Sequence, residues 1–311
     1  MVSARGSLGA APPIPRARIY LGVQAVAGTL WWVAVFASDS VRRWTLGGWN
    51  PTLLVVPDLV LFAGASAVAA AFASRWWAAA CATWTTMVTG ALVAYALLER
   101  EAGWGAVAMV LATVGTLAAT LMLWFGRLPV EWFFVGPFAF HVSEARAPSA
   151  HLRRSLTQLV LFWSTFLIAL PLVLSWAEQR LRLRWALLDG SGWVRLGVVV
   201  FVAFSALGLW ACWSMAIHGE GTPLPAATAR KLVVVGPYRR VRNPMAVAGA
   251  MQTIGVGLLL GSWMVIASSV AGALIWNTFV RPDEERDLAN RLGPDYEEYR
   301  SDVRCWIPAR R

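Results

Sequence analysis

The segment Gly236-Pro-Tyr-Arg-Arg-Val-Arg-Asn-Pro-Met245 decides the fold of this chain, because a dense basic turn runs directly into a long apolar stretch. No side chain between residues 245 and 280 carries a charge. A helix needs about 20 apolar residues to cross a hydrocarbon core of roughly 30 Å, so this stretch is too long for one crossing. We therefore predict two short helices that turn near residues 257–262, with the arginine-rich turn at a membrane surface.

The composition indicates a chain that lies mostly within a bilayer. Of its 311 residues, 58% are hydrophobic and only 14% are charged, and the mean hydropathy is +0.57. Soluble domains contain about 45–50% apolar residues. Stretches of spanning length lie at residues 19–38, 52–74, 76–98, 103–124, 156–177 and 196–217. Together with the hairpin they predict an all-α, polytopic membrane protein of about eight transmembrane helices.

The first of these stretches has an alternative interpretation as a secretory signal peptide. Arg5, Arg16 and Arg18 supply the charged flank. However, its apolar part exceeds the roughly 7–15 residues of a signal core, and no clear small-residue cleavage site follows. We favour a retained helix, preceded by a Pro/Ala/Gly-rich tail at residues 1–17 that we expect to be disordered.

The net charge of +10 is explained by the sidedness of the membrane rather than by a nucleic-acid partner. With the N-terminus in the cytoplasm, most of the 27 Lys and Arg residues fall in cytoplasmic segments, as the positive-inside rule requires. Both termini are then cytoplasmic. The opposite face receives Arg42, Arg43, Arg100, Arg180, Arg182, Arg184 and Arg195.

The chain divides into two parts near residue 190. Residues 18–190 carry about five helices with few polar groups, which we interpret as a membrane scaffold. Asp58 is a charge within this scaffold that could mark a proton path, but a position within reach of the lipid headgroups favours an ordinary structural role. Residues 191–311 carry the polar clusters, and we expect function to reside there.

No metal site is predicted. His141, His151, Glu131 and Glu144 share the loop at about 125–155, but their spacing matches no ligand pattern. The three cysteines likewise have no metal-ligand spacing.

Two polar clusters flank the predicted hairpin. A basic segment at residues 230–242 precedes it and a charged segment at residues 281–286 follows it. Both ends of a helical hairpin lie on the same membrane face, so we expect Arg242 and Asn243 to lie near the glutamates at 284 and 285. A positive-inside loop and an acidic first helical turn would explain each cluster separately. Their order around one hairpin favours a cytoplasmic pocket.

The residue types of this pocket indicate its ligand. Arg230, Lys231 and Arg242 can hold a carboxylate or phosphate, the glutamates can hold an amine or hydroxyls, and Tyr238 can pack on a planar ring. S-adenosylmethionine fits this set well. A nicotinamide dinucleotide fits less well, because its pyrophosphate favours a Gly-rich turn at a helix start. The glycines at residues 255 and 257 resemble part of a dinucleotide-binding fingerprint. They lie in the apolar hairpin with no strand before them, so the structural context that this fingerprint requires is absent.

Several short motifs follow one another in this part of the chain. In order they are Gly-x-Gly-Thr-Pro-x-Pro at 219–225, Leu-Val at 232–233, Gly-Pro-Tyr at 236–238, Arg-Asn-Pro-Met at 242–245, Glu-Glu at 284–285 and Leu-x4-Gly-x2-Tyr-x2-Tyr at 288–299. The set resembles the isoprenylcysteine carboxyl methyltransferase family and its bacterial relatives, which are similar to phospholipid N-methyltransferases. The resemblance covers about residues 195–308 and leaves the first five helices unmatched.

The resemblance implies a methyltransferase region at residues 191–311 that binds S-adenosylmethionine. The implied cofactor contacts are Leu232, Val233, Gly236, Tyr238, Arg242, Asn243, Pro244 and Glu285. The implied catalytic residues are Glu284, Glu285 and Arg281, with Arg281 a candidate for holding an acceptor carboxylate and His218 an alternative proton acceptor. Asn243 and Ala246 depart from the pattern, since many members have His and Tyr there.

The expected function is that of an integral membrane methyltransferase dependent on S-adenosylmethionine, with a lipidic or small hydrophobic thiol, carboxylate or amine as acceptor. Two alternatives stay open: an NADPH-dependent membrane reductase of the sterol-reductase type, and a non-enzymatic membrane protein. High Ala, Arg and Trp content with one lysine indicates a GC-rich bacterial genome, and hence the bacterial inner membrane. The first five helices can shape an acceptor tunnel or form a homodimer interface.

Overall fold

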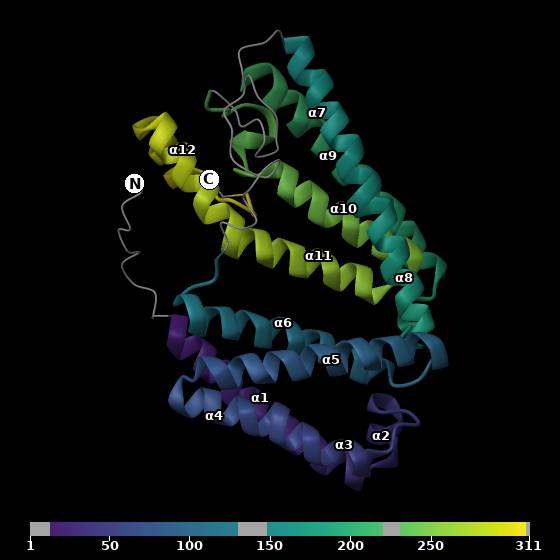
Figure 1. The fold of residues 1–311 in the computed structure, drawn as a ribbon. Coiled ribbons are helices and arrows are strands. Elements are labelled where there is room, and N and C mark those ends of the chain that lie inside the picture. Colours follow the sequence, from purple (N-terminus) through teal and green to yellow (C-terminus); the bar gives the residue numbers. More distant parts are fainter. Residues whose placement is uncertain (1–12, 130–147, 220–230, 309–311) are drawn as a thin grey trace. The chain divides into compact units, whose positions relative to one another are not determined.

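The computed structural model describes residues 13–129, 148–219 and 231–308, and in these ranges all regular structure is helical (Figure 1). The contacts divide the chain into two compact units. The N-terminal unit holds residues 1–129 and 180–183, and the C-terminal unit holds residues 130–179 and 184–311. The all-α class predicted from the sequence is confirmed.

The N-terminal unit consists of apolar helices joined by short turns. They are α1 (Pro13–Ala37), α2 (Asp39–Thr45), α3 (Pro51–Asp58), α4 (Ala65–Phe72), α5 (Arg75–Glu99) and α6 (Gly103–Phe125), with a π-helical segment (Leu59–Gly64) between α3 and α4. Helix α1 begins at Pro13, so the expectation of disorder is wrong for residues 13–17. Proline suits this place because its fixed φ and missing N–H are tolerated in a first helical turn. Residues 1–12 lie outside the described residues.

In the C-terminal unit, π-helical segments interrupt two of the helical runs. The α-helices of this unit are α7 (Pro148–Trp163), α8 (Leu170–Arg180), α9 (Ser191–His218), α10 (Pro244–Leu260), α11 (Trp263–Ile275), α12 (Arg281–Leu292) and α13 (Pro294–Asp302). The π-helical segments Ser164–Ala169 and Trp276–Val280 join α7 to α8 and α11 to α12, and 3-10 turns lie at Ala186–Leu188 and Gly236–Arg239.

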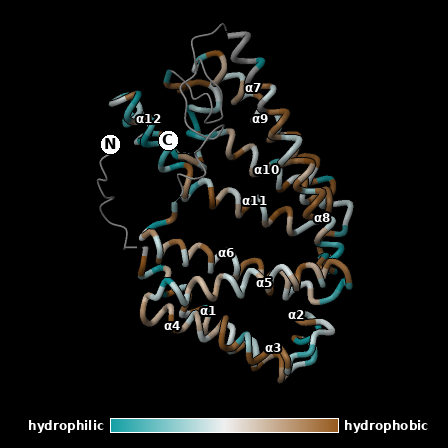
Figure 2. The backbone as a smooth tube through the Cα atoms, viewed as in Figure 1, coloured by the Kyte–Doolittle hydropathy of each residue, from teal (hydrophilic) through white to brown (hydrophobic). Residues whose placement is uncertain are grey.

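The described residues contain seven helices that are long and apolar enough to cross a membrane. Helix α10, which has 17 residues, is apolar but shorter. The predicted number of about eight therefore holds only if this short helix is counted as a crossing. Figure 2 shows mainly apolar and neutral colours along these helices and hydrophilic colours around α12. The protein is thus a polytopic, all-α membrane protein.

The fifth span belongs to the C-terminal unit, whereas the sequence interpretation grouped it with the N-terminal scaffold. Helix α7 packs along α9, and the π-helical segment after α7 contacts α10. Of the residues that follow, only 180–183 group with the N-terminal unit. Side-chain packing decides this boundary, and the composition of a single apolar stretch contains no signal for it.

Small and polar residues hold the N-terminal unit together. Helix α1 packs on α4 and α6 through alanines that include Ala69 and Ala119, because small side chains let helix backbones approach closely within a membrane. Gln24 links the helices by donating to Ser66 Oγ at 2.9 Å and accepting from Thr116 Oγ1 at 2.9 Å. This unit is therefore fixed by polar contacts as well as by shape.

The predicted C-terminal hairpin is confirmed by α10 and α11. The turn lies at Gly261, whose φ is +59°, and at Ser262, whose side chain caps α11. Glu178 of α8 reinforces this turn by accepting from Ser262 Oγ at 2.5 Å and from the Met264 backbone N–H at 3.0 Å. Helix α10 packs closely on α9, where a Cβ at Gly197 would lie 2.8 Å from Gly255 O. The open end of the hairpin carries the polar clusters.

Candidate active site

The site is organised around the carboxylate of Glu285, on the first turns of α12. Glu285 Oε1 lies 3.0 Å from Arg242 Nη2 and 2.9 Å from Arg281 Nε, and Oε2 lies 3.5 Å from Arg300 Nε. The three arginines come from the turn before α10, the start of α12, and α13. The sequence prediction that Arg242 and Glu285 meet across the hairpin is confirmed.

The ion pair between Arg242 and Glu285 dominates the electrostatics, because the two side chains are only 10% and 11% exposed. Arg300 is 44% exposed and more distant, so water weakens its attraction to the carboxylate. Three guanidinium groups face this one carboxylate, and Arg300 also approaches Glu297 Oε2 at 3.7 Å. Nε of Arg242 is buried and has no hydrogen-bond partner among the residues that the structure describes. The cluster therefore retains donor capacity for a further anionic group.

The C-terminal segment is fastened to the basic turn by backbone and side-chain hydrogen bonds. The Arg242 N–H donates to Arg304 O at 2.9 Å, and the Asn243 N–H donates to Cys305 O at 3.4 Å. Tyr299 donates its hydroxyl to Tyr238 O at 2.7 Å. These bonds explain how α13 brings Arg300 to Glu285, a contact between residues that local sequence patterns do not relate.

The basic turn requires glycine at its first residue. Gly236 has a φ of +60°, and a Cβ there would lie 2.7 Å from Ser214 Oγ. The following Tyr238 is buried among Ala211 and Val233. Burial raises the pKa of Tyr238 far above its usual range, so its phenol stays protonated. The ring is thus part of the core, and the predicted stacking of Tyr238 on a ligand would require the ring to leave this cluster.

Asn243 and Pro244 shape the start of α10. Asn243 Oδ1 accepts from the Ala246 N–H at 2.9 Å, which makes Asn243 the N-cap, and Pro244 occupies the first helical turn. Asparagine is among the best N-cap residues. The departure from His at this position is therefore compatible with the fold, and the cap holds the adjacent Arg242 toward Glu285.

Arg281 is held from two sides. Besides Glu285, it contacts Asn277 Oδ1 through Nη1 at 2.8 Å, and the same oxygen accepts from Trp306 Nε1 at 2.8 Å. The π-helical segment Trp276–Val280 places Asn277 one helical turn before Arg281. With these contacts Arg281 can hold the Glu285 carboxylate in position. Its role in holding an acceptor remains a prediction.

The other predicted residues lie around this cluster. Leu232 is half-buried and Val233 buried. Glu284 is half-buried and forms no ion pair with any residue that the structure describes. His218 approaches Ser214 O with its Nδ1 at 3.2 Å, so one ring nitrogen is engaged at the end of α9. Arg230 and most of the 219–225 motif lie outside the described residues.

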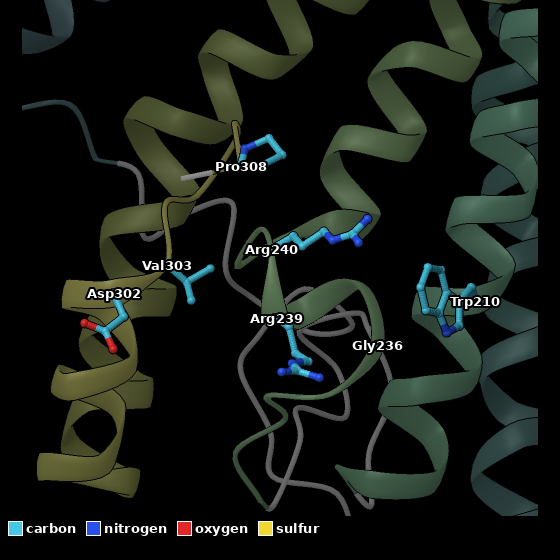
Figure 3. Close-up of a pocket in the computed structure, with 7 residues that line it drawn as sticks. All are labelled: Trp210, Gly236, Arg239, Arg240, Asp302, Val303 and Pro308. Carbon is cyan, nitrogen blue, oxygen red and sulfur yellow. The ribbon is translucent and has the colours of Figure 1, made fainter. Parts of the chain in front are cut away.

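A cavity of about 570 Å³ opens beside the basic turn. Trp210 of α9 and Asp302 lie at its sides, with Gly236, Arg239 and Arg240 between them (Figure 3). Among the predicted site residues, Gly236 is the one that lines this cavity. The sequence interpretation missed Trp210, Arg239, Arg240 and Arg300. Arg239 and Arg240 carried a signal, since they lie within the basic turn itself.

An apolar helical hairpin with a buried charge cluster at its open end is an arrangement that suits a membrane-bound enzyme acting at the bilayer surface. A family model of phospholipid methyltransferases matches residues 193–294, from the start of α9 to the first residue of α13. This region of the chain is similar to that family of membrane methyltransferases. No curated protein and no solved structure matches the chain.

Proposed function

We propose that the protein transfers a methyl group from S-adenosylmethionine to a lipidic or small hydrophobic acceptor. The family match supports methyl transfer at a membrane. The observation that supports the choice of cofactor is the Glu285 cluster. It has three arginines around one carboxylate, and Nε of the buried Arg242 has no partner in the described part of the chain.

The residues of the cluster fit the amino-acid part of this cofactor. Its carboxylate suits the spare donor of Arg242, and charge-assisted hydrogen bonds of this kind are about twice as strong as neutral ones. Its ammonium suits Glu284, which has no ion pair among the described residues. When bound, the cofactor supplies an electrophilic methyl group, which the acceptor heteroatom takes while the C–S electron pair stays on sulfur.

The protein contributes alignment and the exclusion of water. Arg281 and Arg242 fix Glu285, and the N-cap at Asn243 fixes Arg242, so the cluster is preorganised before a ligand arrives. A positive charge on sulfur disappears when an anionic acceptor reacts, and a dry site at the membrane surface favours that loss of charge. We propose Glu284 as the group that receives a proton from a protonated acceptor, because burial raises its pKa to about 7.

The cavity beside the turn suits the polar end of the acceptor. Arg239 and Arg240 provide two cations and Asp302 one carboxylate, so a headgroup with a phosphate or carboxylate finds partners there. Trp210 and Trp213 of α9 expose their indoles, as residues at a bilayer interface do. A lipid tail can run along this helix while the soluble cofactor enters from the cytoplasm. The location we propose is the bacterial inner membrane, with both termini and the site on the cytoplasmic side.

Incubation of the purified full-length protein with methyl-labelled S-adenosylmethionine and membrane lipids tests the proposal, with mass spectrometry of the lipid extract as the readout. We expect labelled lipid from the wild type. We expect Glu285→Gln to weaken cofactor binding at least tenfold, a loss of about 1.4 kcal/mol or more, because it removes the charge that organises three arginines.

The matched control is Asp287→Asn on the same helix, which removes a carboxylate paired with Arg291 and leaves the cluster intact. Its cofactor binding should equal that of the wild type. Tight NADPH binding without S-adenosylmethionine binding would establish the reductase alternative instead. Absence of binding to both cofactors would favour a non-enzymatic membrane protein.

A further inference from the structure

A second cavity, of about 520 Å³, lies within the N-terminal unit. Three chain segments form it: residues 43–48 at the end of α2 and the turn after it, residues 100–104 from the end of α5 to the start of α6, and residues 181–183 after α8. No part of this cavity falls within residues 193–294. The proposed methyl transfer therefore does not account for the residues that line this cavity.

The cavity is strongly positive. Arg43, Arg100 and Arg182 line it, and none of them pairs with an acidic group in the described part of the chain. Glu101 is the single acidic lining residue, and its Oε2 already accepts from the Tyr95 hydroxyl at 2.8 Å. Three cations thus converge on a space that holds a single carboxylate, which leaves an excess of positive charge.

The neighbouring Arg180 shows that an arginine at this end of the unit can also be purely structural. Its Nε donates to Leu97 O at 2.6 Å and its Nη2 to Leu98 O at 3.4 Å, so it satisfies carbonyls at the end of α5. Arg43, Arg100 and Arg182 have no such hydrogen bonds to carbonyls among the described residues. Their guanidinium groups remain available to a ligand.

The backbone around the cavity is strained. Four non-glycine residues in the described ranges have positive φ, and three of them line this cavity: Arg100 at 62°, Ala102 at 55° and Arg182 at 57°. Each such residue costs about 1–2 kcal/mol. Strain of this kind gathers at ligand clamps and active sites, where the surrounding structure enforces it.

Tight packing enforces the strain and fixes the cavity walls. A Cβ at Gly103 would overlap Leu181 O, and one at Gly105 would overlap Thr45 O, so glycine lets the three segments touch. Trp44 and Trp104 stand at the cavity with 61% and 40% of their surface exposed. Exposed indoles at helix ends are typical of the interface between lipid and water.

We infer that this cavity binds a phosphate-bearing anion, either a lipid headgroup or a soluble phosphate ester. Guanidinium groups match the geometry of phosphate oxygens, and three of them in a preformed cavity form a binding site for such an anion. The predicted topology puts these arginines on the non-cytoplasmic face, where arginine is usually depleted, so their clustering there calls for an anionic partner. The inference does not rest on the proposed methyl transfer.

The test uses the full-length protein in two arms. In one arm, the protein is reconstituted in phosphatidylcholine with or without phosphatidylglycerol, and native mass spectrometry measures the anionic lipid retained. In the other arm, glycerol phosphate is added to detergent-solubilised protein and the shift in thermal unfolding is recorded. The variant carries Arg43→Gln, Arg100→Asn and Arg182→Asn, because asparagine tolerates a positive φ.

We expect the variant to bind the anion at least about tenfold more weakly, since each arginine near a membrane surface contributes about 1 kcal/mol. The control triple, Arg42→Gln, Arg184→Gln and Arg195→Gln, changes the net charge equally and lies outside the cavity. It should bind as the wild type does. Arg43→Gln alone, at an ordinary backbone position, should weaken binding even if the triple variant folds poorly.

Retention of phosphatidylglycerol without a response to glycerol phosphate identifies a lipid headgroup as the ligand. The reverse result identifies a soluble phosphate ester. The inference is overturned if neither anion binds, or if the cavity triple and the control triple lose binding equally.

Discussion

The two units each bury a carboxylate, and they stabilise it in different ways. In the N-terminal unit, Asp58 is 8% exposed and accepts from Trp32 Nε1 and Trp84 Nε1, both at 2.8 Å. In the C-terminal unit, Glu285 is surrounded by arginines. The first arrangement uses two neutral donors, one for each oxygen. The second uses more positive charge than one carboxylate can neutralise.

The difference separates a structural contact from a binding site. Both oxygens of Asp58 are satisfied by indoles of its own unit, so nothing in this arrangement awaits a further group. These contacts agree with the ordinary structural role that the sequence favoured for Asp58. Around Glu285, three arginines gather, and Nε of Arg242 has no hydrogen-bond partner among the described residues, which is the basis for proposing a ligand there.

The largest effect should come from removing the buried cation. Arg242→Met leaves Glu285 without its most buried partner, and breaking a buried ion pair costs about 3–5 kcal/mol. Because Arg281 still contacts the carboxylate, we expect the free energy of unfolding to fall by an amount near the lower end of this range. Thermal unfolding in detergent measures the stability, and binding of S-adenosylmethionine should be lost as well. Arg286→Met, on the exposed side of α12, is the control and should change neither.

A smaller effect is expected from Asp58→Asn. The amide NH₂ would face an indole N–H, and an unsatisfied buried donor costs about 1–3 kcal/mol. Methyl transfer per folded molecule should be unchanged, which would separate this carboxylate from Glu285. In a double-mutant cycle, Trp84→Phe should relieve part of the cost by removing the facing donor. Additive losses would contradict the assigned contact.

Tyr299→Phe should have a modest effect. It deletes the hydroxyl that donates to Tyr238 O and leaves the ring in place, so we expect a loss of about 1 kcal/mol in stability. Because α13 then holds Arg300 less firmly, the affinity for the cofactor should fall more than the methyl-transfer rate at saturation. An equal fall in both would show that Tyr299 acts on the chemical step instead.

The smallest expected effect near neutral pH is on stability, and it comes from the ionisation of Tyr296. Burial, with Glu285 nearby, raises the pKa of Tyr296 from 10.0 to about 12. The folded state therefore holds this proton more tightly than the unfolded state. The resulting stability is fully present below pH 10 and is lost as the pH rises toward 12. Unfolding curves across this range should show the decline, and Tyr296→Phe should reduce it.

Much of the fold and part of the site could be predicted from local sequence. Long uncharged stretches indicated the spans, and the length of residues 245–280 indicated a hairpin. Since both ends of a hairpin meet, the contact between Arg242 and Glu285 followed. The contact between Arg300 and Glu285 could not be predicted in this way. It depends on the turn at Gly293, which has a φ of +63°, and on hydrogen bonds from the C-terminal segment.

The sequence alone determined that the chain crosses a membrane as helices, because backbone groups in lipid must be satisfied within each span. It also determined that charge gathers where the hairpin opens. Only the tertiary structure decided that Tyr238 is buried, that Asn243 caps α10 and that Arg239 and Arg240 line the cavity. Such orientations arise from packing between residues distant in the chain, which no local pattern specifies.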